Sequence, residues 1–262
     1  MSTSSTSGRY WSAVRAPRYS LTFAFPLLVA YEALALTLSY RSITGVRNGA
    51  DVLLKSVFVL LGGRNGLLAF GALLVGTGLV LIWRDGRRSG PIEARVFAGM
   101  AAESVAYASG LGLVTGALTG LLLGGLGAVA PARMSLDPVA LSVGVQEAGL
   151  GLATQLMISL GAGIYEELLF RVLLVGLLAW VAGRLFGSPL AAGMFATIAG
   201  ALIFSAFHYV GPYGDPLELG SFVFRAIAGV LFSALYLLRG FGIAAWTHAM
   251  YDVFLALAGG RG

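Results

Sequence analysis

Cysteine is absent from the chain, and charged residues are rare in it. Without cysteine there are no disulfides, no thiolate metal ligands and no cysteine nucleophile, which excludes a whole class of peptidases. Only 11% of the 262 residues are charged and 58% are hydrophobic. In an average soluble domain roughly 25% of the residues are charged. Most of the chain is therefore expected to lie in lipid.

Strict alternation of apolar and polar residues, the pattern of an outer-membrane barrel, is also missing from the long apolar runs. A run of about 20 apolar residues can cross the hydrocarbon core as a helix, whereas an open sheet would leave backbone polar groups unsatisfied there. The sequence therefore predicts an all-α fold, a polytopic transmembrane helical bundle. About eight spans are expected, near residues 20–40, 66–83, 97–128, 138–162, 166–186, 189–209, 219–238 and 240–257.

No linker or shift in composition divides the chain, so we expect a single membrane-embedded domain over residues 1–262. Residues 1–18 form a polar tail, and the apolar run after it is as long as a full span and lacks a small-residue cleavage site. This favours an uncleaved first helix over a signal peptide. The apolar segment 51–62 is too short to span, so it is expected to lie in the interface or to re-enter the membrane.

The net charge of +5 comes from arginines scattered over short loops, with Lys55 as the one lysine. This distribution is typical of charges that orient helices in a lipid bilayer, and it excludes nucleic acid as a partner. The arginine-rich loop 84–95 predicts that this loop and both chain ends face the cytoplasm, although basic residues between positions 41 and 64 oppose that orientation. An arginine-rich, cysteine-free chain is typical of bacteria, so we expect a multi-pass protein of the bacterial inner membrane.

Ionisable residues inside apolar spans are costly, and each of them is therefore a candidate for function. Glu32 and Glu103 stand alone in their spans and are interpreted as structural, each with a hydrogen bond or a partner such as Arg225. Glu147 lies near the end of a span and is interpreted as interfacial. The other candidates form three short patterns in the second half of the chain.

The first pattern is Tyr-Glu-Glu-Leu-Leu-Phe-Arg at residues 165–171. On an α-helix Glu167 and Arg171 are four residues apart with the acid first, the favourable order for an ion pair. Glu166 is rotated by about 100° from Glu167, so Arg171 is poorly placed to neutralise it. Glu166 is thus predicted to be the carboxylate left for chemistry, able to accept a proton from water and to release it later.

The other two patterns contain both histidines of the chain. His208 closes the sixth predicted span, four residues after Phe204. His248 and Asp252 are four residues apart on the last span, so they share a helix face on which the carboxylate can orient the imidazole. A lone histidine in a span would be interpreted as a satisfied core residue. Because both are spaced in this way and Glu166 precedes them, a functional interpretation is favoured.

Together these patterns resemble those of the CAAX protease and bacteriocin-processing family, also called the Abi family, of glutamate-dependent intramembrane peptidases. The series in that family is Glu-Glu-x-x-x-Arg, then Phe-x-x-x-His, then His-x-x-x-Asn or Asp. The chain matches it at residues 166–171, 204–208 and 248–252, in that order. The resemblance covers residues 150–257 and implies a catalytic helical core there, while the N-terminal half carries no identifying motif.

The resemblance implies an endopeptidase that hydrolyses a peptide bond in a membrane-anchored protein or peptide. Glu166, helped by His208, would activate a water for attack on the peptide carbonyl. His248 and Asp252 would stabilise the oxyanion. Where the chain has Asp252, well-understood members have asparagine, and an ionised aspartate cannot donate a hydrogen bond. Asp252 would therefore be protonated, or it would orient a donating His248.

Glu167, Arg171 and Phe204 would support this site, and the resemblance implies no cofactor. The active site is expected to open to the cytoplasmic side. Because the chain looks bacterial, a bacteriocin-like leader or a sorting signal is a more plausible substrate than a prenylated protein.

Other peptidase mechanisms fit the sequence less well. One glutamate and two histidines could bind zinc with a water in the fourth position, but neither histidine belongs to a His-Glu-x-x-His motif. A rhomboid-type serine peptidase would have Gly-x-Ser, which does not occur in the chain. Tyr251-Asp252 looks like half of a presenilin-type aspartyl site, but the partner motif Gly-x-Gly-Asp is broken at residues 211–215.

Two alternatives come from other functional classes. Buried acids and histidines with Arg225 could form a proton relay in a transporter, but such folds often show an internal repeat and none is visible here. A non-catalytic immunity or scaffold protein could keep the same fold. Substitution of Glu166 separates these classes, because a scaffold would keep its biological effect.

Overall fold

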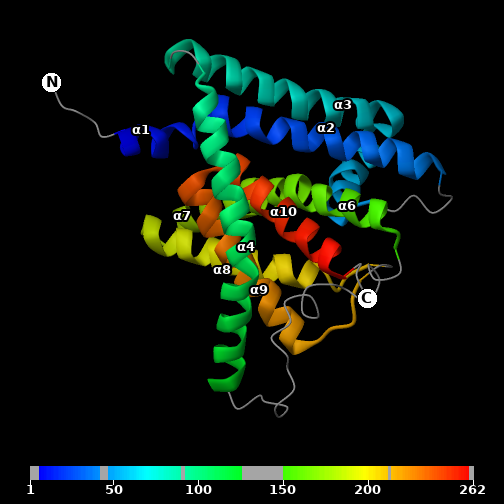
Figure 1. Ribbon diagram of the computed structural model, residues 1–262, viewed down its shortest axis with the longest axis vertical. Coiled ribbons are helices and arrows are strands. Elements are labelled where there is room, and N and C mark those ends of the chain that lie inside the picture. Colours follow the sequence, from blue (N-terminus) through cyan, green and yellow to red (C-terminus); the bar gives the residue numbers. More distant parts are fainter. Residues whose placement is uncertain (1–5, 42–46, 90–91, 126–149, 212–213, 260–262) are drawn as a thin grey trace. The chain divides into compact units, whose positions relative to one another are not determined.

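The computed structural model describes residues 6–41, 47–89, 92–125, 150–211 and 214–259 (Figure 1). Within these ranges the regular elements are helices and there is no strand, so the predicted all-α class is confirmed. Seven of the described helices are long and apolar enough to cross a membrane, which is consistent with about eight spans. The chain is therefore a multi-pass membrane protein.

The helices follow the apolar runs of the sequence. The first four are α1 (Thr6–Ala13), α2 (Pro17–Arg41), α3 (Gly49–Ser89) and α4 (Ala94–Gly125). The next three, which follow one another without a break, are α6 (Leu152–Gly161), the π-helix η2 (Ala162–Val175) and α7 (Gly176–Leu185). The last three are α8 (Pro189–Phe207), α9 (Leu219–Arg239) and α10 (Phe241–Gly259).

Five predicted spans agree with these helices to within a few residues, namely 20–40, 97–128, 189–209, 219–238 and 240–257. They agree because charged, Gly and Pro residues bound the apolar runs on both sides.

The predicted span 166–186 begins too late. A continuous helix of 34 residues runs from Leu152 to Leu185, so Glu166 lies well inside it and not at its start. The helix continues through Gly161 and Gly163, since glycine within an apolar run is no certain break in a helix packed against neighbours. Of the predicted span 138–162, residues 138–149 lie outside the described residues, as does Glu147.

The segment 51–62 is a short helix that turns back on the helix after it. The break is at Gly62 and Gly63, and Gly63 has φ +55°, a left-handed conformation that glycine adopts without strain. The rings of Phe58 and Phe70 lie 5.2 Å apart, although residues twelve apart on a straight helix would be separated by about 18 Å. Residues 49–61 are thus separate from the apolar helix that follows.

The chain forms two compact units. The first contains residues 1–105, 157–169 and 235–250, and the second contains residues 106–156, 170–234 and 251–262. Both η2 and α10 therefore contribute to each unit. The prediction of a single domain stays a prediction.

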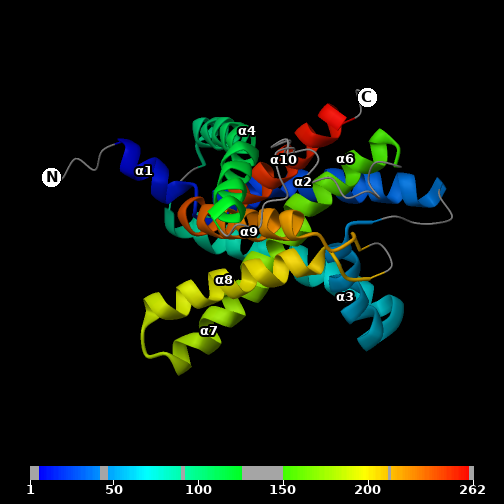
Figure 2. The ribbon, with the colours of Figure 1, turned by 90° about the horizontal axis from the view of Figure 1, so that it is seen from below.

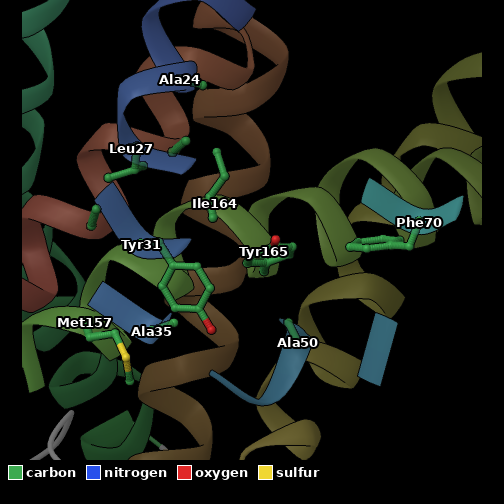
Figure 3. Close-up of a cluster of buried hydrophobic side chains, with 11 residues drawn as sticks. Ala24, Leu27, Tyr31, Ala35, Ala50, Phe70, Met157, Ile164 and Tyr165 are labelled. Atoms are coloured by element: carbon green, nitrogen blue, oxygen red, sulfur yellow. The ribbon is translucent and has the colours of Figure 1, made fainter. Parts of the chain in front are cut away.

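The first unit is packed around aromatic and small side chains from five helices (Figure 3). Tyr31 of α2 lies at the centre, with its ring 5.3 Å from that of Tyr165 in an edge-on contact. The Tyr165 ring also stacks on Phe70 at 6.4 Å. Helices α2 and α3 lie side by side in both views (Figures 1 and 2). In lipid such contacts stabilise the fold by close packing and not by expelling water.

The second unit is built on the neighbouring helices α7 and α8, which lie side by side (Figure 2). A side chain at Gly200 of α8 would collide with Val175, and one at Gly229 of α9 would press against Ala201 and Phe204. Small residues at such positions let helix backbones approach closely, as is typical of membrane bundles.

Two buried arginines have carboxylate partners that the sequence did not identify. Arg239 binds Glu103 through two of its nitrogens, with Nε 2.8 Å from Oε2, and its guanidinium lies 3.6 Å from the centre of the Trp11 ring. Arg225 binds Asp215 at 2.6 Å. The partner of Glu103 is therefore Arg239 and not Arg225, because α9 brings its C-terminal arginine to α4.

Candidate active site

The first motif lies in η2, whose 14 residues are π-helical. A π-helix pairs each residue with the one five positions on, and π-helical turns are rare and frequently found at functional sites. The prediction that set Glu166 apart from Arg171 assumed α-helical rotation. That premise is wrong for this segment, because a separation of five residues is the hydrogen-bonded spacing of a π-helix.

Glu166 is buried, with 7% of its surface exposed, and it accepts a hydrogen bond from Asn48. Nδ2 of Asn48 lies 2.8 Å from Oε1 of Glu166, and Asn48 is itself only 3% exposed. Sequence analysis missed this amide, because Asn48 stands 118 positions earlier in a polar stretch without a motif.

Glu167 is fully buried and binds His248. Oε1 of Glu167 lies 2.8 Å from Nδ1 of His248. Because an ionised carboxylate only accepts hydrogen bonds, Nδ1 carries the hydrogen in this pair. The sequence predicted Arg171 as the partner of Glu167 and Asp252 as the group that orients His248. The observed carboxylate on Nδ1 is Glu167, which the tertiary fold of the first unit brings to α10.

Gly163 allows this contact between η2 and α10. A Cβ atom at position 163 would lie 2.6 Å from the Cβ of Ala249 and would also collide with the carbonyl oxygen of Ala245. The two helix backbones therefore approach each other closely one turn before Glu167. The glycine is needed at this position because backbone atoms cannot move aside as a flexible side chain can.

His208 lies at the C-terminal end of α8, as the sequence predicted, and is half-buried. Its Nδ1 is 2.9 Å from the carbonyl oxygen of Phe204, four residues earlier, and its ring packs edge-on against the Phe204 ring at 4.9 Å. A carbonyl oxygen accepts only, so Nδ1 donates here as well. The amide of Asp215 donates to the backbone oxygen of His208 at 2.9 Å and holds the following loop against it.

Arg171 is buried, with 1% of its surface exposed. Its guanidinium lies over two aromatic rings of the second unit, 4.3 Å from the centre of Phe204 and 5.4 Å from that of Phe232. A cation over an aromatic face is stabilised by the ring electrons, more so away from water. Phe204 thus contacts both Arg171 and His208.

Asp252 is half-buried on α10, four residues after His248. Of the predicted site residues, the first unit contains Glu166, Glu167 and His248. The second contains Arg171, Phe204, His208 and Asp252. The catalytic roles assigned to these residues stay predictions.

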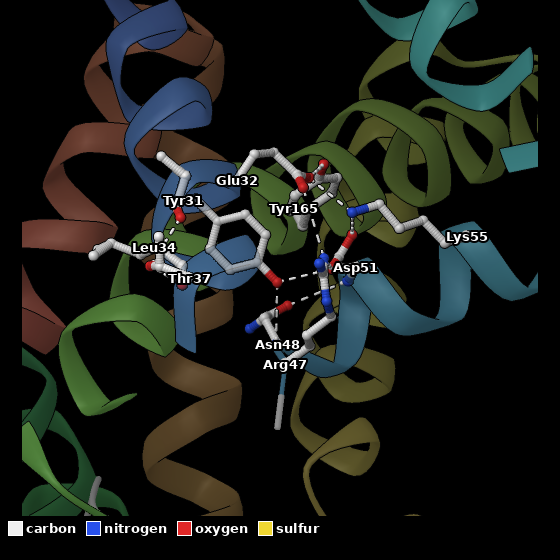
Figure 4. A network of polar contacts seen from close by, with 10 residues as sticks. Tyr31, Glu32, Leu34, Thr37, Arg47, Asn48, Asp51, Lys55 and Tyr165 are labelled. Atoms are coloured by element: carbon white, nitrogen blue, oxygen red, sulfur yellow. Dashed lines mark hydrogen bonds and ion pairs between the residues drawn. The ribbon is translucent and has the colours of Figure 1, made fainter. Parts of the chain in front are cut away.

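A polar network of the first unit lies at the start of α3 (Figure 4). It includes Asn48, which binds Glu166. The carboxylate of Asp51 binds the Tyr31 hydroxyl at 2.8 Å, Arg47 at 3.0 Å and Lys55 at 2.6 Å. Burial by itself would lower the pKa of Arg47. The hydrogen bond and charge of Asp51, with Tyr31 and Glu32 nearby, raise the pKa by more than that, so the guanidinium stays charged. A lysine in a short apolar segment was the one sequence signal for this network.

Glu32 completes the network from α2. Its Oε1 accepts hydrogen bonds from Lys55 at 2.7 Å and from the Tyr165 hydroxyl at 2.5 Å. The prediction that Glu32 is structural therefore agrees with its contacts, although its partners are Lys55, Tyr165 and Arg47 in place of Arg225. Tyr165 directly precedes Glu166, so the network reaches the first motif by two routes.

In the part of the chain that the structure describes, no group of three or more His, Asp or Glu side chains is arranged to hold a metal ion. Glu167 and His248 are adjacent, but they already bind each other.

The second half of the chain is similar to a known protein family. Residues 148–254 match the family described as Rce1-like, type II CAAX prenyl endopeptidase. The match includes every predicted site residue and nearly coincides with the predicted range 150–257, so the predicted resemblance is confirmed. No curated protein and no solved structure matches the chain.

Proposed function

We propose that this protein, which over residues 148–254 belongs with the Rce1-like CAAX-type intramembrane proteases, is a glutamate-dependent endopeptidase. The observation that carries the proposal is the pair of adjacent buried acids in η2. Glu166 accepts a hydrogen bond from Asn48, and Glu167 accepts one from His248. The two carboxylates thus have different partners, which suits them to different tasks.

In the proposed reaction Glu166 and His208 activate a water molecule. Glu166 takes a proton from the water, and the remaining hydroxide attacks the carbonyl carbon of the scissile peptide bond. When the tetrahedral intermediate collapses, the C–N bond breaks and the proton passes from Glu166 to the leaving nitrogen. The hydrogen bond from Nδ1 of His208 to the carbonyl oxygen of Phe204 supports this role, because it assigns the action on the water to Nε2.

His248 and Asp252 are the proposed oxyanion site. With Nδ1 donating to Glu167, a doubly protonated His248 donates from Nε2 to the oxyanion, and the Glu167 carboxylate stabilises the positive charge of the ring. Asp252 is either protonated and a second donor, or it orients His248. The proposal requires no cofactor, and zinc is tested below as the rival.

The proposed substrate is a membrane-anchored protein or peptide that approaches from the lipid bilayer. The family description names prenyl endopeptidases, so a prenylated peptide belongs in any substrate panel beside leader-type peptides. We place the protein in the bacterial inner membrane with the site open to the cytoplasm. The arginines of the loop 84–95 support this orientation.

The test is cleavage of a panel of prenylated, membrane-anchored and leader-type peptides by the detergent-purified protein. Wild type is compared with Glu166→Gln and His208→Ala, each with and without a chelator. Glu103→Gln serves as the matched control, because it neutralises a carboxylate of the first unit that binds Arg239.

Loss of cleavage in both site variants, retention in the control and indifference to the chelator would support the glutamate peptidase. Loss on chelation with rescue by zinc would replace it with a metallopeptidase. If wild type cleaves no peptide and Glu166→Gln keeps the biological effect in cells, the protein is a scaffold.

A further inference from the structure

Asn48 has two separate hydrogen-bonding tasks at the start of α3. Its side-chain oxygen accepts from the backbone amides of Ala50 at 2.9 Å and Asp51 at 3.4 Å, so Asn48 is the N-cap of this helix. Its side-chain nitrogen donates to Glu166 at 2.8 Å. The two bonds to Oδ1 fix the orientation of the amide group, and Nδ2 then donates to Glu166.

The cap alone does not require asparagine. Ser, Thr and Asp cap helices about as well, because capping needs only a side-chain oxygen. Among these residues only asparagine adds a side-chain N–H donor to that oxygen. The choice of residue at position 48 therefore follows from the bond to Glu166.

We propose that Asn48, from outside the matched range 148–254, is a positioning residue that holds the carboxylate of Glu166 in its ionised form and in one orientation. The inference rests on the proposed function, in which Glu166 is the base. A hydrogen bond from an amide N–H to a carboxylate oxygen stabilises the ionised form of the carboxylate. The N-terminal half of the chain thus contributes to the site.

The surroundings of Asn48 hold it in place. Its backbone amide donates to the Tyr31 hydroxyl at 3.4 Å, and that hydroxyl donates to Asp51 at 2.8 Å. Asp51 is fully buried and bound to Arg47 and Lys55. A side chain held at both its backbone and its cap cannot turn away from Glu166 without breaking several of these bonds.

Gly161 makes room for this arrangement. A Cβ atom at position 161, five residues before Glu166, would lie 2.7 Å from the Cβ of Asn48 and 2.6 Å from the Tyr31 ring. The end of α6 can approach Asn48 only because glycine stands there. Two independent features of the first unit, the capped amide and the glycine gap, therefore lead to the same contact.

The contacts of the first unit link several titratable groups to Asn48 and Glu166. They are Tyr31 and Glu32 of α2, Arg47 before α3, Asp51 and Lys55 of α3, Tyr165 and Glu167 of η2, and His248 of α10. Glu32, Arg47, Asp51 and Lys55 bind one another, so Asn48→Asp would add one carboxylate to a set of charges that is otherwise unchanged.

The decisive substitution is Asn48→Asp, which keeps the capping oxygen and the shape but replaces the donor by a second carboxylate oxygen. In this variant Glu166 loses a donor and gains a like charge, so it is protonated more easily. We expect kcat/KM at neutral pH to fall by about tenfold or more and the acidic limb of the pH profile to move up by about one unit. Asn48→Ser keeps a cap without adding charge, so it should move the acidic limb of the pH profile in the same direction but by less.

A second measurement needs no substrate. Combining Asn48→Asp with Glu166→Gln exchanges donor and acceptor, so the bond can form again in the opposite sense. The thermal unfolding midpoint of the double variant should lie closer to wild type than that of Asn48→Asp alone. Ser188→Ala, which removes the N-cap of α8, shows the effect of losing a cap by itself.

The outcomes separate this inference from the proposed function. If Glu166→Gln still cleaves, the proposed function fails and the unfolding midpoints decide whether Asn48 and Glu166 are coupled. If Glu166→Gln is inactive while Asn48→Asp keeps the wild-type kcat/KM and pH profile, Asn48 is only a cap and the inference is overturned. Additive midpoints in the double variant overturn it as well.

Discussion

Two regions of the first unit bind carboxylates in different ways. Glu103 of α4 faces the guanidinium of Arg239, which binds both of its oxygens. In η2, Glu166 accepts a hydrogen bond from the Asn48 amide, and Glu167 binds the His248 imidazole. Both arrangements give a carboxylate a hydrogen-bond donor, but a guanidinium that binds both oxygens does so more strongly than a single donor.

The difference separates structure from chemistry. A two-point guanidinium pair neutralises the charge of Glu103 and ties two helices together. In the proposed function the carboxylate of Glu166, which accepts a hydrogen bond from an amide, exchanges a proton with water. Substitutions can therefore be expected to affect stability in the first region and activity in the second.

The largest effect is expected for Glu167→Ala. The imidazole of His248 would lose the carboxylate that orients it, and kcat/KM should fall by about 100-fold or more, a loss typical of a disrupted oxyanion site. Cleavage kinetics of the purified protein measure kcat/KM, and thermal unfolding shows separately whether its stability has changed. Glu167→Gln keeps an acceptor for Nδ1 and should retain more activity. If Glu167→Ala were as active as wild type, the orientation of His248 by Glu167 would not be needed for cleavage.

Glu103→Gln should show the reverse behaviour. Arg239 stays buried without a charged partner, so the unfolding free energy should fall by about 1.5–3 kcal/mol while kcat/KM of the folded protein is unchanged. Denaturation in detergent measures the first quantity. Glu93→Gln is the matched control, because its pair with Arg95 is exposed and should contribute nothing measurable. A loss of activity without a loss of stability would contradict the division between the two regions.

Gly163→Ala tests the packing that brings Glu167 to His248. The added methyl group would meet the backbone of α10, and we expect a loss of about 1–3 kcal/mol in stability together with reduced cleavage. Gly183→Ala in α7 is the control, since a Cβ atom there meets nothing within 4 Å. That variant should be neutral or slightly more stable. The same result for both variants would show that the close approach at Gly163 is not needed.

The smallest effect is expected for Tyr31→Phe. Asp51 would lose one hydrogen bond but keep Arg47 and Lys55, so the unfolding free energy should fall by about 1 kcal/mol. Activity should fall less than in Asn48→Asp, because the donor to Glu166 remains. Thermal unfolding measures the loss of stability, and a cleavage assay measures the loss of activity. A larger loss of activity in Tyr31→Phe would mean that the network acts on Glu166 mainly through Tyr31.

Much of the fold could be predicted from the sequence. The bilayer demands long apolar helices, so their number and most of their limits follow from the apolar runs. The motif residues could also be found, because ionisable groups are rare in spans and those of each motif are close in sequence. His208 at the end of α8 is a clear example.

The contact between Glu167 and His248 could not be predicted. The structure pairs these two residues across 81 positions, whereas helical spacing relates only residues a few positions apart, such as Glu167 with Arg171 and His248 with Asp252. The π-helical geometry of η2 was also missed, because no short pattern of residues distinguishes a π-helix from an α-helix.

The sequence by itself determined that the chain is a helical membrane protein and which acids and histidines are candidates for catalysis. Both conclusions depend on local properties, namely the hydropathy of runs and the cost of a charge in lipid. Only the tertiary structure decided that Asn48 binds Glu166 and that His248 binds Glu167. These contacts join distant segments, and they depend on the close approaches at Gly161 and Gly163, which arise only when the helices pack.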